Sequence, residues 1–142
     1  MLDNRALVAA FVAWLIAQVI KLVIGLVRDG RINLRYLVST GGMPSAHSAL
    51  VTALTVAIGR QAGLQSPLFA IAAVFAAVVL YDAAGLRQAV SIQARILNRM
   101  LDEIFSQHAI SESRLREFLG HTPFEVSVGF GLGVLIGFVL TL

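Results

Sequence analysis

Four apolar segments, of which the second is short, are the feature that most limits what this chain can fold into, and polar connections separate them. A helix needs about 20 mostly apolar residues to cross a bilayer. The segments run roughly from Ala6 to Val27, from the Gly41–Pro44 breaker to about Ile58, from Ser66 to about Leu86, and from Thr122 to Leu142. The sequence therefore predicts an all-α polytopic membrane bundle with about four transmembrane helices, in a single domain over residues 1–142.

Composition agrees with a membrane location. The chain is 58% hydrophobic and only 13% charged, whereas about a quarter of the residues in a soluble domain carry a charge. The net charge of +3 is small, so nucleic acid is not an expected partner. The absence of cysteine excludes disulfides, thiolate metal sites and a cysteine nucleophile. The first segment is too long for a signal-peptide core and lacks a clear cleavage site, so we expect it to be retained.

Two polar connections remain, from Arg28 to Met43 and from Arg87 to His121. The second has apolar residues at helical spacing, among them Ile92, Ile96 and Met100, which predicts one or two amphipathic helices on the membrane surface. With four spans both connections lie on one side, and they hold most of the arginines. The positive-inside rule then places them in the cytoplasm, most simply at a bacterial inner membrane. This orientation requires that the second segment spans.

Lys21 and Arg28 lie seven residues apart in the first segment. That spacing is two helical turns, so both side chains point the same way, about 10 Å apart along the axis. They are candidates to bind an anion. The alternative is that long cations near a helix end reach for lipid phosphates. This applies more to Arg28 than to the deeper Lys21.

The stretch from Gly41 to Ser48 reads GGMPSAHS. Glycines such as Gly42 let the backbone approach a ligand, and the helix that Pro44 is predicted to start presents free N–H groups to an anion. Ser45 adds a hydroxyl, and His47, in the first turn, can exchange a proton with the same ligand. The alternative is an ordinary helix start with a polar first turn.

Asp82 and Arg87 form a third polar group near the end of the third segment, where an unpaired carboxylate is expensive. They are candidate site residues, or a structural ion pair at a helix end. Gln93 and Asn98 would extend a polar stripe that lines the same candidate site, or would be solvated.

The last polar group reads GHTPFE, over residues 120–125. Thr122, Pro123 and Glu125 fit a capping box at a helix start without any catalysis. The capping box does not explain His121. A carboxylate one turn away can hold an imidazole in one tautomer and stabilise its cation, as a catalytic base requires. Glu125 can serve both roles.

Gly129, Gly133 and Gly137 form a small-residue stripe on the last segment. Such a stripe predicts close helix packing. The contact is either within the chain or between copies, so a homo-oligomer through this face is one of the two interpretations.

Taken in order, Lys21-x6-Arg28, Pro44-Ser45-Ala46-His47 and His121-x3-Glu125 are similar to the three-part signature of the type-2 phosphatidic acid phosphatase and vanadium haloperoxidase superfamily. The stretches GGMPSAHSALV, YDAAGLRQAVSIQARILN and LGHTPFEV resemble its small divergent membrane branch. The resemblance implies that His121 attacks phosphorus, Glu125 orients it and His47 protonates the leaving oxygen. Lys21, Arg28, Gly42, Ser45 and an arginine would hold the phosphate, and neither a metal nor another cofactor would be needed.

The chain also departs from the superfamily pattern. Asp29 follows Arg28 where proline is usual, Ala46 replaces a glycine, and Glu125 replaces an aspartate. The third-motif arginine is either Arg87 or Arg114, and we favour Arg87 because it ends a membrane helix beside Asp82, while Arg114 is a possible support. The superfamily core has six helices, so surface helices or a partner chain would have to complete it.

These observations predict a membrane lipid phosphatase that hydrolyses a phosphate monoester or diphosphate through a phosphohistidine. Phosphatidylglycerophosphate and phosphatidic acid, which are made on the cytoplasmic face, are the first substrates to consider. The alternative is a small non-catalytic transporter or lipid-binding subunit, whose cations would bind anionic headgroups. A haloperoxidase is a third option that the hydrophobic chain disfavours.

Overall fold

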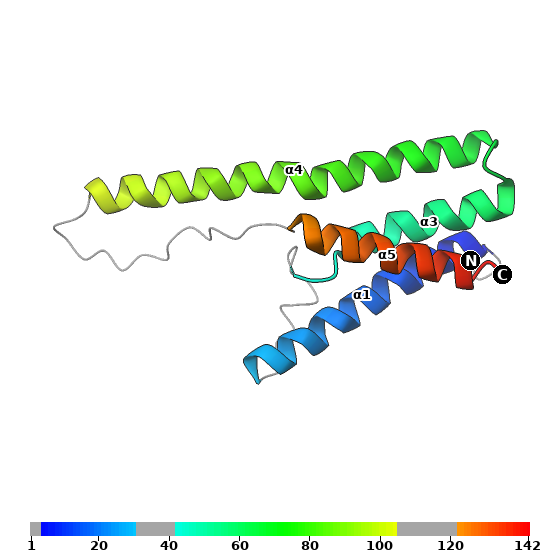
Figure 1. Cartoon of the computed structure of the whole chain (residues 1–142), viewed down its shortest axis with the longest axis horizontal. Coiled ribbons are helices and arrows are strands. Elements are labelled where there is room, and N and C mark those ends of the chain that lie inside the picture. The colour runs from blue at the N-terminus through cyan, green and yellow to red at the C-terminus, as the bar shows by residue number, and fades with distance from the viewer. Residues whose placement is uncertain (1–3, 31–41, 105–121) are drawn as a thin grey trace.

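The computed structural model describes residues 4–30, 42–104 and 122–142, and Figure 1 shows their arrangement. The regular elements in these ranges are four helices and no strand, which confirms the all-α prediction. The helices are α1 (Arg5–Asp29), α3 (Ala46–Ala62), α4 (Pro67–Ile104) and α5 (Pro123–Val139).

Local capping explains where several of these helices begin and end. The Asn4 side chain accepts a hydrogen bond from the Leu7 N–H at 3.1 Å, and α1 ends at Gly30, whose φ of 64° is the left-handed cap that favours glycine. The predicted start at Ser66-Pro67 is confirmed, because the Ser66 hydroxyl accepts from the Phe69 N–H at 3.2 Å. Each cap satisfies backbone groups that a helix end would otherwise leave without a partner.

α3 lies at the centre of the bundle and packs against each of the other three helices. Within the described ranges α1 and α4 do not touch each other. The Thr55 hydroxyl of α3 donates to the carbonyl of Ala72 in α4 at 3.2 Å, which joins these two helices. α3 and α5 run parallel, so both begin at the same end of the bundle (Figure 1).

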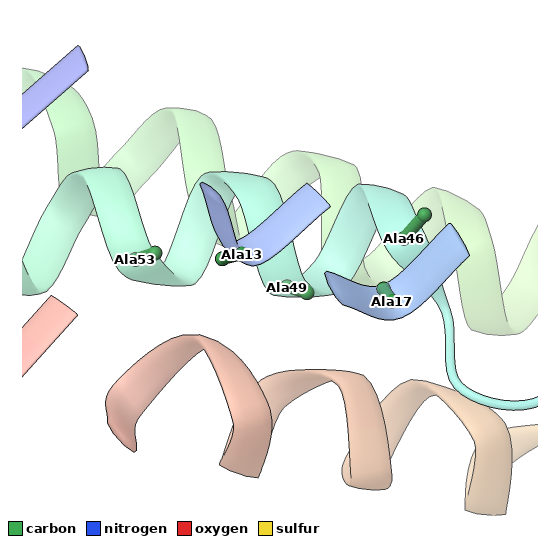
Figure 2. Packing of buried hydrophobic residues seen from close by; sticks show 5 residues of the cluster. All are labelled: Ala13, Ala17, Ala46, Ala49 and Ala53. Atoms are coloured by element: carbon green, nitrogen blue, oxygen red, sulfur yellow. The ribbon is translucent and has the colours of Figure 1, made fainter. Parts of the chain in front are cut away.

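The interior of the bundle is built from small residues. Ala13 and Ala17 of α1 pack on Ala46, Ala49 and Ala53 of α3 (Figure 2). The large apolar side chains point outward instead, among them Phe11, Leu15, Ile71, Phe75 and Leu135. A water-soluble bundle has the opposite arrangement, whereas small residues at helix contacts are typical of membrane proteins.

Within the described ranges, two helical segments are long and apolar enough to cross a membrane, namely Arg5–Arg28 and Pro67–Ala84. α5 is a shorter apolar helix of 17 residues. α3 also has 17 residues and is more polar, since it buries Ser48 and Thr52 against its neighbours. The four predicted segments all form helices. Their crossing of the bilayer stays a prediction, which the length and composition of α1 and α4 support more directly than those of α3 and α5.

α4 differs from the prediction for the third segment and the second polar connection. We expected a span that ends near Leu86, followed by separate amphipathic helices, but one helix of 38 residues continues through to Ile104. The drop in hydropathy at Arg87 is not a helix stop signal. Residues 86–104 hold no proline or glycine and are mostly good helix formers such as arginine, alanine and leucine. The short helix that Ser111 and Gly120 would bracket lies outside the described residues.

Candidate active site

The described motif positions of α1, α3 and α5 lie at one end of the bundle. The starts of α3 and α5 lie there, and the C-terminal half of α1 runs toward the same end but diverges from them in its last turns, while the opposite end holds the α3–α4 turn and the C-terminus (Figure 1). At that opposite end the Arg60 guanidinium lies 4.0 Å from the centre of the Phe138 ring, so α3 and α5 are also in contact far from the motifs.

Lys21 faces the inside of the bundle. It follows Ala13 and Ala17 at four-residue spacing on the buried side of α1, and its side chain is only 4% exposed. Because Ala17 packs in the same cluster as Ala46 at the start of α3, one further turn along α1 brings Lys21 level with the turn that precedes α3. Arg28 lies two turns beyond it, exposed, on the last turn of α1.

The turn before α3 requires a glycine at Gly42, whose φ is +97°. α3 begins at Ala46 with Ser45 as its N-cap, two residues later than the predicted start at Pro44. The difference arises because a serine hydroxyl is the better cap: Ser45 Oγ accepts hydrogen bonds from the Ser48 N–H at 3.3 Å and the Ser48 hydroxyl at 2.9 Å.

Ser45 and His47 have opposite surroundings. Ser45 is fully buried, with 0% exposure. His47, two residues later in the first turn of α3, is exposed. Of these two side chains, the His47 imidazole is therefore the one that a ligand at the end of the bundle can reach.

Glu125 forms the predicted capping box at the start of α5. The Thr122 N–H donates to Glu125 Oε2 at 3.0 Å, and the Glu125 N–H donates to Thr122 Oγ1 at 3.3 Å. Glu125 is half-buried, while Thr122 is exposed. The capping role of Glu125 is thus confirmed, and any role beside His121 would be additional to it.

A main-chain hydrogen bond joins the two motifs. The Ser45 N–H donates to the carbonyl of Glu125 at 3.0 Å. Ser45 and Glu125 are 80 residues apart in the sequence, and this bond fixes the start of α3 to the first turn of α5. His47 and Glu125 are therefore carried by two helix starts that are fastened to each other.

The glycine stripe of α5 packs on α3 of the same chain. Gly129 lies against Ser45 and Ser48, Gly133 against Ala49 and Thr52, and Gly137 against Ala53 and Val56. Of the two predicted packing roles, the structure shows the one within the chain. An additional contact with a second copy stays a prediction.

The polar residues predicted on α4 have different surroundings, where their side chains are described. Asp82 is exposed, Gln93 is exposed and Asn98 is buried. Five residues separate Gln93 from Asn98, which places them about 140° apart around a helix, so they do not form one stripe. Arg87 lies in α4, but its side chain is outside the described part of the structure.

Two predicted site residues, His121 and Arg114, lie outside the described residues. Among the residues that are described, no group of three or more His, Asp or Glu side chains is placed to hold a metal ion. Sequence reasoning missed Ser48 and the contact of Gly129 with Ser45. Their signals were a second hydroxyl one turn after the cap and a glycine one turn after Glu125.

Comparison with known families shows which family the chain belongs to. Residues 2–136 match the model of the Divergent PAP2 family. The chain belongs to this family. It is also 37% identical to the uncharacterized membrane protein YuiD of Bacillus subtilis (strain 168), over 99% of this chain and 96% of that protein. No solved structure matches it.

Membership of the Divergent PAP2 family agrees with the resemblance drawn from the motifs. The description of the relative as a membrane protein agrees with the large apolar side chains on the outside of this bundle. The match covers α1, α3, α4 and most of α5. All the motif positions of this divergent PAP2 protein thus lie within the matched range.

Proposed function

We propose that this divergent PAP2 protein is a metal-independent lipid phosphatase that works through a phosphohistidine. The observation that carries the proposal is the hydrogen bond from the Ser45 N–H to the Glu125 carbonyl. It fastens the helix start that bears His47 to the helix start that follows His121. Lys21 is buried one turn beyond Ala17 on the same face of α1, and from there it would reach the turn beside these helix starts.

Phosphoryl transfer requires positive charge around the phosphate oxygens, an in-line nucleophile and an acid for the leaving group. Lys21, Arg28 and Arg87 would supply the charge. Gly42 and Ser45 would shape the turn at the N-terminus of α3, where N–H groups favour an anion. Because Ser45 is fully buried, its contribution would come from the shape of this turn.

The reaction has two steps. In the first, a ring nitrogen of His121 attacks phosphorus, the P–O bond to the lipid breaks, and His47 gives its proton to the leaving lipid oxygen. In the second, water attacks the phosphohistidine, His47 takes a proton from that water, and inorganic phosphate leaves from His121. Glu125 would hold the other ring nitrogen of His121 protonated and stabilise the imidazolium.

The substrate would be a lipid phosphate monoester or diphosphate whose tails stay in the bilayer. The arginine distribution favours a cytoplasmic site, and phosphatidylglycerophosphate and phosphatidic acid are the first substrates to test. The outward-facing large apolar residues support the presence of lipid around the bundle.

A second function is a non-catalytic membrane protein that binds anionic headgroups. The capping box favours this possibility, because it explains Thr122 and Glu125 without any reaction.

Phosphate release from a panel of lipid phosphates, measured with purified protein in detergent and EDTA, separates the two functions. We expect turnover by the wild type, none by His121→Ala, and a severe loss in His47→Ala that is smaller for an aryl phosphate, whose leaving group needs little protonation. Acid-quenched enzyme should carry acid-labile, base-stable phosphate, and His121→Ala should not. Label that persists without His121, or headgroup binding without any phosphate release, would refute the phosphatase.

A further inference from the structure

We propose that Gly129 is a positioning residue, which sets the separation of His47 from Glu125 by letting α5 rest directly on the main chain of Ser45. This inference rests on the proposed phosphatase function. It concerns a residue that lies outside the three motifs and carries no chemistry of its own.

The contact at Gly129 leaves no room for a side chain. A Cβ atom built on Gly129 would collide with the Ser45 carbonyl oxygen and would lie 3.1 Å from both the Ser45 nitrogen and the Ser48 Cβ. The obstacle is mainly backbone, which cannot rotate away as a flexible side chain can. A larger residue would therefore push the starts of α3 and α5 apart.

Ser45 cannot absorb that displacement by itself. Its N–H donates to the Glu125 carbonyl, its carbonyl accepts from the Ala49 N–H at 3.0 Å, and its hydroxyl is bonded to Ser48. Ser45 is also 0% exposed, so neighbouring atoms surround it on all sides and it cannot shift without displacing them. Any shift imposed at Gly129 is thus passed to the hydrogen bond between Ser45 and Glu125.

The proposed acid, His47, and the group proposed to orient the nucleophile, Glu125, are both attached to this junction. His47 follows Ser45 by two residues in the first turn of α3, and Glu125 precedes Gly129 by one turn of α5. A misplacement of about 1 Å at a reacting group can lower a rate about 100-fold. The junction is therefore expected to influence the rate of reaction more than the affinity for the substrate.

The same stripe offers matched controls. A Cβ on Gly133 would lie 2.6 Å from the Ala49 carbonyl oxygen, and one on Gly137 would lie 2.8 Å from the Ala53 carbonyl oxygen. These two positions share the helix, the face and the kind of collision with Gly129. They differ from it by lying one and two turns farther from Ser45.

The experiment compares Gly129→Ala, Gly133→Ala and Gly137→Ala in the full-length protein in detergent. We expect all three to lower Tm. Only Gly129→Ala should lower kcat, by about 10- to 100-fold at nearly unchanged KM, with a smaller loss on an aryl phosphate because His47 matters less there. Hydrogen exchange at the Ser45 amide should speed up in Gly129→Ala and stay slow in Gly137→Ala.

Equal kcat losses in the three variants, or a kcat of Gly129→Ala within twofold of Gly133→Ala, would overturn the proposal. If Gly129→Ala does not fold, Ser48→Ala removes the 2.9 Å bond to Ser45 without a collision. It should lower kcat severalfold, and an unchanged kcat would count against the junction. A wild type without turnover would refute the phosphatase itself, and the Ser45 amide exchange would still decide whether Gly129 holds the junction.

Discussion

Glu125 has an observed structural role and a proposed catalytic one, and two substitutions in one capping box separate them. Glu125→Gln keeps an oxygen that can accept from the Thr122 N–H, so the capping box survives while the negative charge is lost. Thr122→Ala removes the hydroxyl that accepts from the Glu125 N–H, so the cap is lost while the carboxylate remains.

Thr122→Ala should lower the stability more than Glu125→Gln, and Glu125→Gln should lower the activity more than Thr122→Ala. Loss of a threonine N-cap costs about 1 kcal/mol, which for a chain of this size lowers Tm by about 3 °C. Glu125→Gln keeps the cap and forfeits the favourable charge at a helix N-terminus, worth roughly 0.3–1 kcal/mol. For catalysis the loss of the carboxylate beside the nucleophile should cost roughly 1,000-fold or more in kcat, and Thr122→Ala should keep most of its activity.

The assay is phosphate release at a temperature well below both Tm values, with Tm measured on the same preparations. Glu125→Asp is the third variant, because it restores the charge on a shorter side chain and should recover part of the rate. Substantial turnover by Glu125→Gln would reduce Glu125 to a helix cap. A Thr122→Ala protein that is folded but as inactive as Glu125→Gln would show that the two roles cannot be separated.

Three further predictions follow from other parts of the molecule. Among the residues that the structure describes, the buried Thr52 hydroxyl has no hydrogen-bond partner, so Thr52→Val should leave Tm unchanged or raise it. Thr55→Val loses the bond to α4 and should cost about 1 kcal/mol, and equal Tm changes in the two variants would contradict this. Cysteines placed at Arg35 and Glu112 should resist an impermeant thiol reagent in intact cells while one at Gly63 reacts, and the reverse pattern would invert the predicted orientation. Activity should survive EDTA and be inhibited by vanadate, since the proposed chemistry relies on cations and histidine; loss on chelation with recovery on adding Mg²⁺ would refute the mechanism.

The parts of the fold that follow local rules could be predicted from the sequence. Ser66 and Thr122 cap their helices as expected, because an N-cap is decided by residues within one turn. The glycine stripe predicted close packing, because small residues at four-residue spacing leave a flat helix face. Lys21 faces inward because it shares a face with Ala13 and Ala17.

The non-local contacts could not be predicted in this way. The bond between Ser45 and Glu125 joins main-chain groups. Nearly every residue has the same main-chain groups, so the amino-acid sequence does not indicate which of them will pair. The burial of Ser45 depends on where α5 crosses α3, which a single sequence does not specify. The continuity of α4 past Leu86 was missed because a drop in hydropathy indicates a change from lipid to water around the helix, not its end. Whether the helix continues depends on the helix propensity of the next residues and on the lack of a proline or glycine among them.

The length of α4 has a mechanical consequence. Its 38 residues extend about 57 Å, roughly twice the hydrocarbon thickness of a bilayer, which is about 30 Å. If the apolar half, Pro67–Ala84, is a membrane span, as its length and composition allow, about 27 Å of the same helix would extend beyond the bilayer. A tilt of about 20°, common for membrane helices, displaces the far end sideways by about 9 Å. In that arrangement α4 would be a lever, because a change in bilayer thickness that alters its tilt would move its outer arm sideways, beside the end of the bundle where the motifs lie.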